Sequence, residues 1–149
     1  MKLLLITLFI VLTSTLGNAQ TTQKYNSLYD RTEFFDANGR MIGYAKENTI
    51  FNRIDYFDAN GKLVKYQKKN DVFDRKDTYD ARGNQAGYEK KNEVFETVDI
   101  FDENGKKIGY RKWNKVFDRY DVFNSNGSKV GHYKYNTIYK RWDYTESSY

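Results

Sequence analysis

The chain has 149 residues, of which 30% are charged and 39% hydrophobic, and it contains neither cysteine nor proline. The absence of cysteine excludes disulfides, thiol nucleophiles and thiolate metal sites, so packing and sheet hydrogen bonds must supply the stability. The net charge of +5 is spread along the sequence instead of forming a basic patch, which argues against a nucleic-acid partner.

Residues 1–19 predict a secretory signal peptide. Lys2 provides a short basic region, residues 3–12 form an apolar run, and the small residues Gly17 and Ala19 precede a cleavage position before Gln20. The apolar run is too short for a membrane anchor. We therefore expect an exported protein, periplasmic or extracellular, in which residues 20–149 form a single domain.

The rest of the chain is a tandem repeat with a period of 22 residues. A fixed short period indicates small units that contact mainly their neighbours. One full unit, residues 72–92, reads VFDRKDTYDARGNQAGYEKKN; a fragment opens the array at Leu28 and a half unit closes it from Ile138. Glycine, asparagine and lysine each recur at one phase of the period: Gly39, Gly61, Gly83, Gly105 and Gly127; Asn26, Asn48, Asn70, Asn92, Asn114 and Asn136; Lys24, Lys46, Lys68, Lys90, Lys112 and Lys134.

Two turns punctuate each unit. The first is Asp-x-Asn-Gly or a close variant, as at residues 58–61, in which the acidic side chain caps the turn and glycine supplies a positive φ. The second is centred on the periodic asparagine followed by a polar residue, as at Asn70 and Asp71, and also predicts a tight hairpin. Runs of about eight residues rich in Phe, Tyr, Val and Ile lie between the turns and predict strands.

The strands have one regular and one variable face. The regular face carries an aromatic, Arg, Asp, aromatic pattern before the glycine turn and an aliphatic, Tyr, Lys pattern after it. If the glycine turn is a four-residue loop, the two patterns share a face, and Arg53 and Arg75 flank Tyr66 in a cation–π ladder. A three-residue loop with a bulge would separate the patterns and remove the ladder.

Neither face is purely apolar. The variable face, for example, mixes Ile54 and Tyr56 with Lys65 and Gln67. A sandwich or a closed barrel is expected to need a clean apolar face. The sequence therefore predicts an all-β fold, an antiparallel meander of about eleven strands arranged as a single-layer twisted sheet or an open β-solenoid.

Three families of bacterial β-hairpin repeat proteins share this pattern. Residues 79–84, YDARGN, resemble the YD repeat of RHS-type surface proteins. The 22-residue period and residues 104–109, NGKKIG, resemble MORN-variant repeats, and residues 56–62, YFDANGK, more distantly resemble glucan- and choline-binding cell-wall repeats. The resemblance spans about residues 24–143 and implies binding or scaffolding instead of catalysis.

The sequence predicts no catalytic residue, metal ligand or cofactor. The single histidine, His132, stands where other units have tyrosine, so it is interpreted as a substituted aromatic position. The Asp-x-Asn-Gly turns lack the later ligands and the closing glutamate of a calcium loop. The repeated aspartates, Asp99 excepted, follow a basic residue two positions earlier, so ion pairing accounts for them. We expect a non-enzymatic protein.

Positions that differ between units are free of the structural demands of the repeat, so a specific surface is expected there. Large aromatic residues occupy four such positions near the C-terminal end: Trp113, Tyr133, Tyr135 and Trp142. Stacked rings of this kind suit a sugar or a peptide. They would equally serve to cover the last strands, and both interpretations stay open.

The predicted function is a binding or scaffold module at the cell envelope or outside the cell, with a protein or glycan partner. The alternative is a carbohydrate-binding module for a glucan or cell-wall polymer. We expect no membrane span after processing, because Lys or Arg occurs on both faces of many strands and would interrupt a lipid-facing band.

Overall fold

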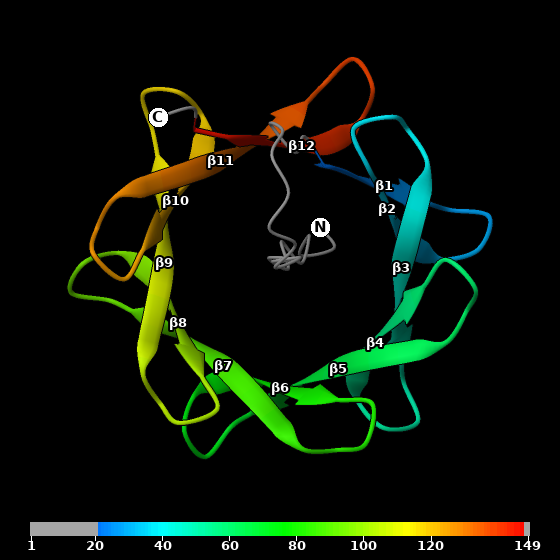
Figure 1. Ribbon diagram of the computed structural model, residues 1–149, viewed down its shortest axis with the longest axis horizontal. Helices are drawn as coiled ribbons and strands as arrows, with labels where there is room; N and C mark the ends of the chain where they lie inside the picture. Colours follow the sequence, from blue (N-terminus) through cyan, green and yellow to red (C-terminus); the bar gives the residue numbers. More distant parts are fainter. Residues whose placement is uncertain (1–20, 148–149) are drawn as a thin grey trace.

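The computed structural model describes residues 21–147, so the predicted signal peptide lies outside the described residues. Twelve antiparallel strands follow one another around a ring, and β1 pairs with β12 to close the sheet into a barrel (Figure 1). Within the described range no helix is long and apolar enough to cross a bilayer. The strands are β1 (Thr21–Asn26), β2 (Arg31–Phe35), β3 (Met41–Asn48), β4 (Arg53–Asp58), β5 (Leu63–Asn70), β6 (Arg75–Asp80), β7 (Gln85–Asn92), β8 (Thr97–Asp102), β9 (Lys107–Asn114), β10 (Arg119–Asn124), β11 (Lys129–Asn136) and β12 (Arg141–Glu146).

The predicted all-β antiparallel meander of hairpin repeats is confirmed, with twelve strands where about eleven were expected, but the prediction of an open twisted sheet or solenoid is wrong. The additional strand is β1, whose sequence TTQKYN lacks the Gly-Tyr pair that marks the equivalent strand β3. This strand completes the half unit at the C-terminus. Lys24 faces Arg141 across the β1–β12 seam in the same register in which Lys134 faces Arg119 across the β10–β11 hairpin.

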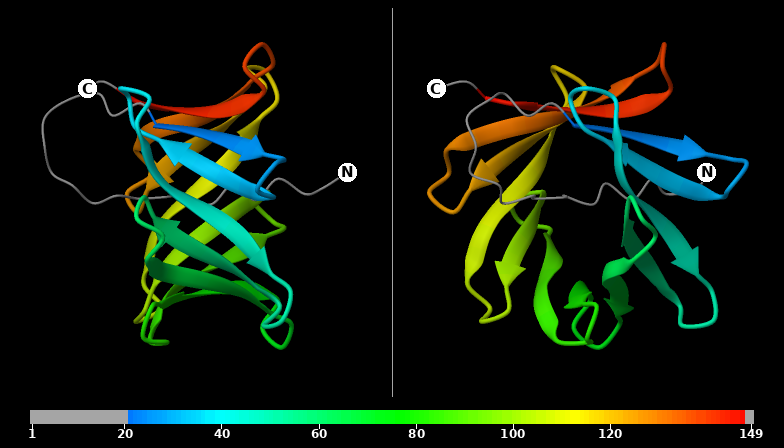
Figure 2. Two further views of the ribbon diagram at one scale, coloured as in Figure 1. Left: turned by 90° about the vertical axis from the view of Figure 1, so that its right-hand side faces the viewer. Right: turned by 45° about the vertical axis from the view of Figure 1, so that its right-hand side comes forward.

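The seam is therefore the sixth repeat, paired like the other five but without a connecting turn. Five glycine turns lie at one end of the barrel, the glycine end, together with both ends of the described chain. Six asparagine turns lie at the other, the asparagine end (Figure 2). Closure leaves no free sheet edge, which removes the unpaired backbone groups that an open meander would expose.

A clean apolar face is not needed for closure, because the inward polar groups pair with one another. Tyr56 donates a hydrogen bond from its hydroxyl to Gln67 Oε1 (3.0 Å), and Gln67 Nε2 donates to Thr78 Oγ1 (3.1 Å). Beside them, Phe34, Ala45 and Tyr56 form the buried apolar cluster. The core is thus a partly polar inner layer, and the variable face of the sequence is the inside of the barrel.

The constant residues of the repeat form one connected network on the outer wall. Asn70 accepts a hydrogen bond from the backbone N–H of Phe73 (3.3 Å) and donates one from Nδ2 to Asp77 (2.6 Å). Asp77 Oδ1 lies 2.7 Å from Nε of Arg75. The Arg75 guanidinium lies 4.9 Å from the ring centre of Phe73 and 4.1 Å from that of Tyr88 on the next strand. Each network therefore ties a turn to two strands.

The two patterns of the regular face share the outer wall, which is the arrangement that was expected from a four-residue loop. The Arg53 guanidinium lies 4.0 Å from the ring centre of Tyr66. On its other side Tyr66 stacks on Tyr79, with ring centres 5.0 Å apart, so the expected second contact of Tyr66 with Arg75 is wrong. The loop itself has three residues, because the backbone N–H of Asp58 donates to the carbonyl of Lys62 (3.0 Å), so the prediction that only a four-residue loop keeps the shared face is wrong. A bulge beside the loop shifts the register, so that Phe57 faces Leu63 but Tyr56 faces Lys65, and this shift keeps the two patterns on one face.

The asparagine turns are longer than predicted. In the second turn Ile50 and Phe51, which the sequence placed in a strand, lie in the loop between β3 and β4, and Asn52 has a φ of 49°. Equivalent positive-φ residues close the other five turns. The aliphatic–aromatic pair of every unit is consequently at a turn tip and not in the sheet.

The glycine turns have the predicted geometry. Asp58 Oδ1 accepts hydrogen bonds from the backbone N–H groups of Asn60 and Lys62, both at 2.9 Å, and Gly61 has a φ of 82°. A Cβ on Gly61 would meet only the Tyr44 hydroxyl, at 3.5 Å, which is ordinary contact. Backbone conformation, and not space, is therefore what requires glycine here.

Replacing Gly61 tests this requirement. We expect Gly61→Val to lower the free energy of unfolding by about 1–3 kcal/mol, because a β-branched residue is strained at positive φ. Gly61→Asn is the matched control, since asparagine tolerates the left-handed region, and we expect it to lose less. Urea unfolding measures both; equal stability of the two variants would contradict the assigned turn.

Candidate functional site

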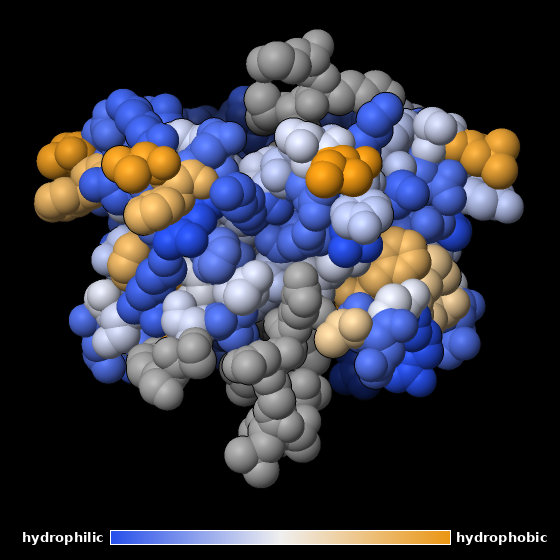
Figure 3. Space-filling model, turned by 90° about the horizontal axis from the view of Figure 1, so that it is seen from above, coloured by the Kyte–Doolittle hydropathy of each residue, from blue (hydrophilic) through white to orange (hydrophobic). Residues whose placement is uncertain are grey.

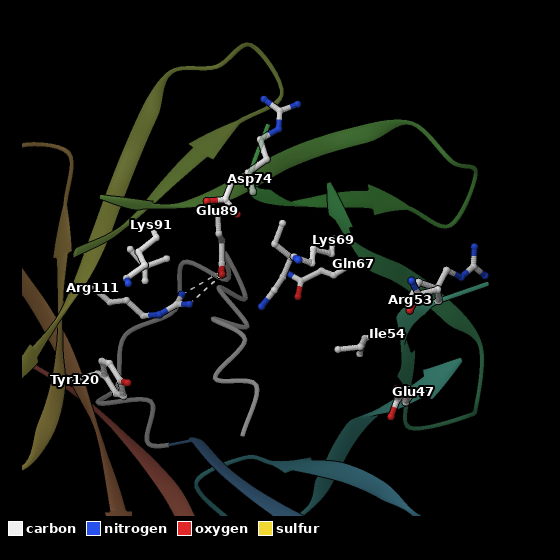
Figure 4. Close-up of a pocket in the computed structure, with 14 residues that line it drawn as sticks. Glu47, Arg53, Ile54, Gln67, Lys69, Asp74, Glu89, Lys91, Arg111 and Tyr120 are labelled. Carbon is white, nitrogen blue, oxygen red and sulfur yellow. Dashed lines mark hydrogen bonds and ion pairs between the residues drawn. The ribbon is translucent and has the colours of Figure 1, made fainter. Parts of the chain in front are cut away.

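The lumen of the barrel holds a cavity of about 660 Å³ at the asparagine end. Its wall runs from turn residues at the mouth, such as Asn52 and Asp74, to Gln67, Glu89 and Arg111 at the middle of the strands (Figure 4). A barrel of eight strands is just wide enough for side chains to fill. Twelve strands enclose a wider lumen, which side chains narrow without closing.

One residue from each strand lies at the middle of the lumen, and these positions are eleven residues apart. Across each asparagine turn the two members face one another directly, as Glu89 faces Ile100. Most of them are buried. This central ring consists of Gln23, Phe34, Ala45, Tyr56, Gln67, Thr78, Glu89, Ile100, Arg111, Val122, Tyr133 and Tyr144. Equivalent members differ widely between repeats, unlike the constant residues of the outer wall.

Glu89 and Arg111 form an ion pair inside the lumen. Arg111 donates two hydrogen bonds to the carboxylate, Nη1 to Oε1 at 3.1 Å and Nη2 to Oε2 at 3.0 Å. Both side chains are only 9% exposed. The two residues lie on β7 and β9, one repeat apart, so the pair spans the intervening strand β8. A buried, bidentate ion pair of this kind fixes both side chains in place.

Lysines lie on one side of this ion pair, on strands β5 to β7. We call Lys65, Lys69, Lys76 and Lys91 the lysine wall. Burial lowers the pKa of Lys76, attraction by Glu89 opposes this, and repulsion from Arg111 adds to the lowering. Burial likewise lowers the pKa of Lys65, opposed by Glu89. The cavity lining also includes the carboxylates of Glu47 and Asp74, but lysine and arginine side chains outnumber the acidic ones in it.

Nearer the mouth, the two outer lysines of this wall have partners in the turns. Lys69 Nζ lies 2.6 Å from Asp71, and Lys91 Nζ lies 2.7 Å from Glu93. Both pairs are well exposed, so water screens them and they contribute little to stability. The lysines can therefore exchange these carboxylates for another anion at low cost.

The other side of the lumen is aromatic. Trp113, Tyr120, Tyr135 and Trp142, which we call the aromatic wall, form a continuous row on β9 to β12. The ring centres are 4.7 Å apart for Trp113 and Tyr120, 6.0 Å for Tyr120 and Trp142, and 5.5 Å for Trp142 and Tyr135. Trp113 and Tyr135 keep 36% and 41% of their surface exposed. The row can therefore accept a flat ring.

The structure thus brings together three of the four aromatic residues that the sequence predicts as ligand-binding, namely Trp113, Tyr135 and Trp142. Tyr133 lies apart from them in the central ring, where it is 3% exposed and contacts Tyr144 with ring centres 4.6 Å apart. Burial raises the pKa of the Tyr133 hydroxyl. Tyr133 therefore packs the middle of the barrel, whereas the other three lie closer to the asparagine end. Of the aromatic wall, Tyr120 is the member that lines the cavity of about 660 Å³, and the other three extend the row from it.

Sequence reasoning missed Tyr120, Lys76 and the Glu89–Arg111 pair. All four residues occupy positions that differ between repeats. This variation could have identified them if the variable face had been recognised as the inside of a barrel. His132 lies on the outer wall opposite Asp121, where burial lowers its pKa. Among residues 21–147 no group of three or more His, Asp or Glu side chains is placed to hold a metal ion.

Comparisons with known proteins define the fold alone. No protein-family model matches the chain, and no curated protein matches its sequence. The X-ray structure of a protein from Arabidopsis thaliana is similar in three dimensions, with a TM-score of 0.64 and 14% sequence identity. The match covers 87% of this chain and 79% of the plant protein. The closed architecture therefore has a counterpart among solved structures.

The buried ion pair gives a prediction on stability. We expect Arg111→Met to lower the free energy of unfolding by about 3–5 kcal/mol, because it leaves the Glu89 carboxylate buried without a partner. The double variant Glu89→Gln with Arg111→Met should recover most of this loss. Chemical unfolding of the three proteins measures the coupling; single and double variants of equal stability would show that the two side chains do not form a pair.

Proposed function

We propose that this chain is an exported, non-enzymatic binding module whose lumen holds a small anionic ligand with a planar or sugar ring. The observation that carries the proposal is the distribution of sequence differences among the six repeats. Outer-wall residues such as Asn70, Arg75 and Asp77 recur with few changes. The residues of the central ring, and the inward-facing residues between this ring and the asparagine end, differ from repeat to repeat.

A barrel built only for stability has no need of this divergence. Six equivalent lumen positions hold Gln23, Ala45, Gln67, Glu89, Arg111 and Tyr133, a set that includes a buried ion pair. Replacing a buried ion pair with apolar side chains is often neutral or stabilising, so the pair contributes little that stability alone would require. It does fix charged groups beside a cavity, which is what a binding site requires.

The two walls define the ligand class. The lysine wall supplies cations that are partly removed from water, so an anionic group gains more there than at a surface. The aromatic wall supplies faces on which a sugar or planar ring can stack, and it stands on β9 to β12, a different part of the ring in Figure 1 from β5 to β7. Acidic saccharides combine both features, so the carbohydrate-binding alternative fits this lumen better than a peptide does.

The cavity size is compatible with this class. Pockets for small molecules generally measure about 300–1,000 Å³, and the lumen of about 660 Å³ falls within that range. A polymer chain could enter only by its end, because the lumen is surrounded by strands on every side. Short acidic oligosaccharides are therefore the proposed ligands. Export rests on the predicted signal peptide alone.

Intrinsic fluorescence tests the proposal directly, because the two tryptophans of the chain, Trp113 and Trp142, both belong to the aromatic wall. We expect digalacturonate to change the tryptophan emission of the mature protein and cellobiose, a neutral disaccharide, to change it less. Lys76→Gln should weaken digalacturonate binding about tenfold, the loss expected from one charged hydrogen bond.

Lys68→Gln is the matched control, since Lys68 lies on β5 but is exposed on the outer wall. Equal binding of both disaccharides, or an unchanged affinity of Lys76→Gln, would refute the anionic specificity. No emission change and no calorimetric heat with any acidic saccharide would refute the lumen as a saccharide site.

A further inference from the structure

The asparagine end carries an unusual number of exposed apolar side chains. Each of its six turns has an aliphatic residue at the tip, 81–87% exposed, followed by an aromatic residue that is 54–65% exposed. We call these twelve residues the crown: Leu28, Ile50, Val72, Val94, Val116 and Ile138, with Tyr29, Phe51, Phe73, Phe95, Phe117 and Tyr139. Several crown residues are visible as orange groups along the upper end of the molecule in Figure 3.

The turns hold these side chains away from the barrel. In the third turn Asn70 accepts the Phe73 N–H and Asp74 adopts a φ of 48°, which reverses the chain immediately after the aromatic residue. The Arg75 guanidinium then packs against the Phe73 ring from the barrel side. Because six turns repeat this geometry around a closed barrel, their tips lie at one height and define a plane (Figure 2).

A ring of lysines lies behind the aliphatic and aromatic residues of the crown. Each strand that leads into an asparagine turn carries an exposed lysine two residues before the asparagine: Lys24, Lys46, Lys68, Lys90, Lys112 and Lys134. Moving from the tips toward the middle of the barrel, the surface is therefore aliphatic, then aromatic with acidic turn residues such as Asp74 and Glu96 beside the rings, then basic. Interfacial membrane anchors have this order, with apolar side chains in the acyl region, rings at the headgroups and cations near the phosphates.

We propose that the crown docks the barrel onto the surface of a phospholipid bilayer. The inference goes beyond the lumenal ligand and rests on different residues. The tips are separated by polar turn residues such as Asp71 and Asp74, so they form no continuous patch for a protein partner. A fluid bilayer can surround each tip separately, and a plane of lipid reaches all six at once.

Other occupants fit less well. Thr21, the first described residue, lies at the glycine end, opposite the crown. A second copy docked crown to crown would bring two rings of six lysines together, and like charges repel. Phosphate headgroups instead complement the lysine ring.

Vesicle co-sedimentation of the mature protein tests the proposal. We expect binding to vesicles of phosphatidylethanolamine and phosphatidylglycerol, and an increase in binding with the phosphatidylglycerol fraction. A variant with Val94→Ser, Phe95→Ser, Val116→Ser and Phe117→Ser removes two adjacent tips and should lower the partition coefficient about tenfold or more, because it removes most of their inserted apolar area. All four side chains are exposed, so the fold should persist, which circular dichroism checks.

The double variant Val64→Ser with Ile108→Ser is the matched control, since these half-exposed apolar residues lie near the glycine end. It should bind vesicles as the parent protein does, and so should Lys76→Gln, which separates this test from the lumen. The proposal is overturned if the parent protein stays in the supernatant with vesicles of both lipids. It is also overturned if the tip variant sediments normally, or if light scattering shows a dimer that the tip variant abolishes.

Discussion

The pairing of β1 with β12 is the constraint on which the rest of the structure depends. Five of the six repeats are closed by a covalent glycine turn, but the sixth is assembled from the two ends of the described chain. Without this seam the sheet would have two free edges and no lumen. The lysine and aromatic walls would no longer enclose a cavity, and the six apolar tips would no longer share a plane.

Closure also gives the outer and inner faces of each repeat different roles. Outside, an asparagine, an aspartate, an arginine and two rings form a network that joins a turn to two strands, and nearly the same network recurs around the barrel. This constant exterior leaves the interior free to diverge, so that charged groups gather on one side of the lumen and rings on the other. If both proposals hold, the cavity mouth and the crown share one end, and docking would place the mouth at the headgroup layer.

Much of the outer wall could be predicted from the sequence, because hairpin turns, strand alternation and the contact of Arg53 with Tyr66 are local. Closure could not, since it depends on the stagger accumulated over all repeats and on β1, whose short sequence resembles the repeat weakly. Charged residues on the variable face indicated that this face contacts solvent. In the structure Arg111 is instead buried and forms an ion pair with Glu89, which lies two strands away. Trp113, Tyr135 and Trp142 could be identified because equivalent positions in the other repeats hold different residues. The burial of Tyr133 could not be predicted, because it depends on the central ring that forms only when the barrel closes.

Amide hydrogen exchange, resolved by residue, tests the closed barrel most directly. The account predicts that amides hydrogen-bonded across the β1–β12 seam are protected to nearly the same degree as those between β6 and β7, because the barrel opens as one unit. Strands at the edge of an open sheet would instead exchange rapidly through their unpaired amides. Fast exchange along both β1 and β12, with protection rising toward β6 and β7, would contradict closure and the lumen and crown geometry that follow from it.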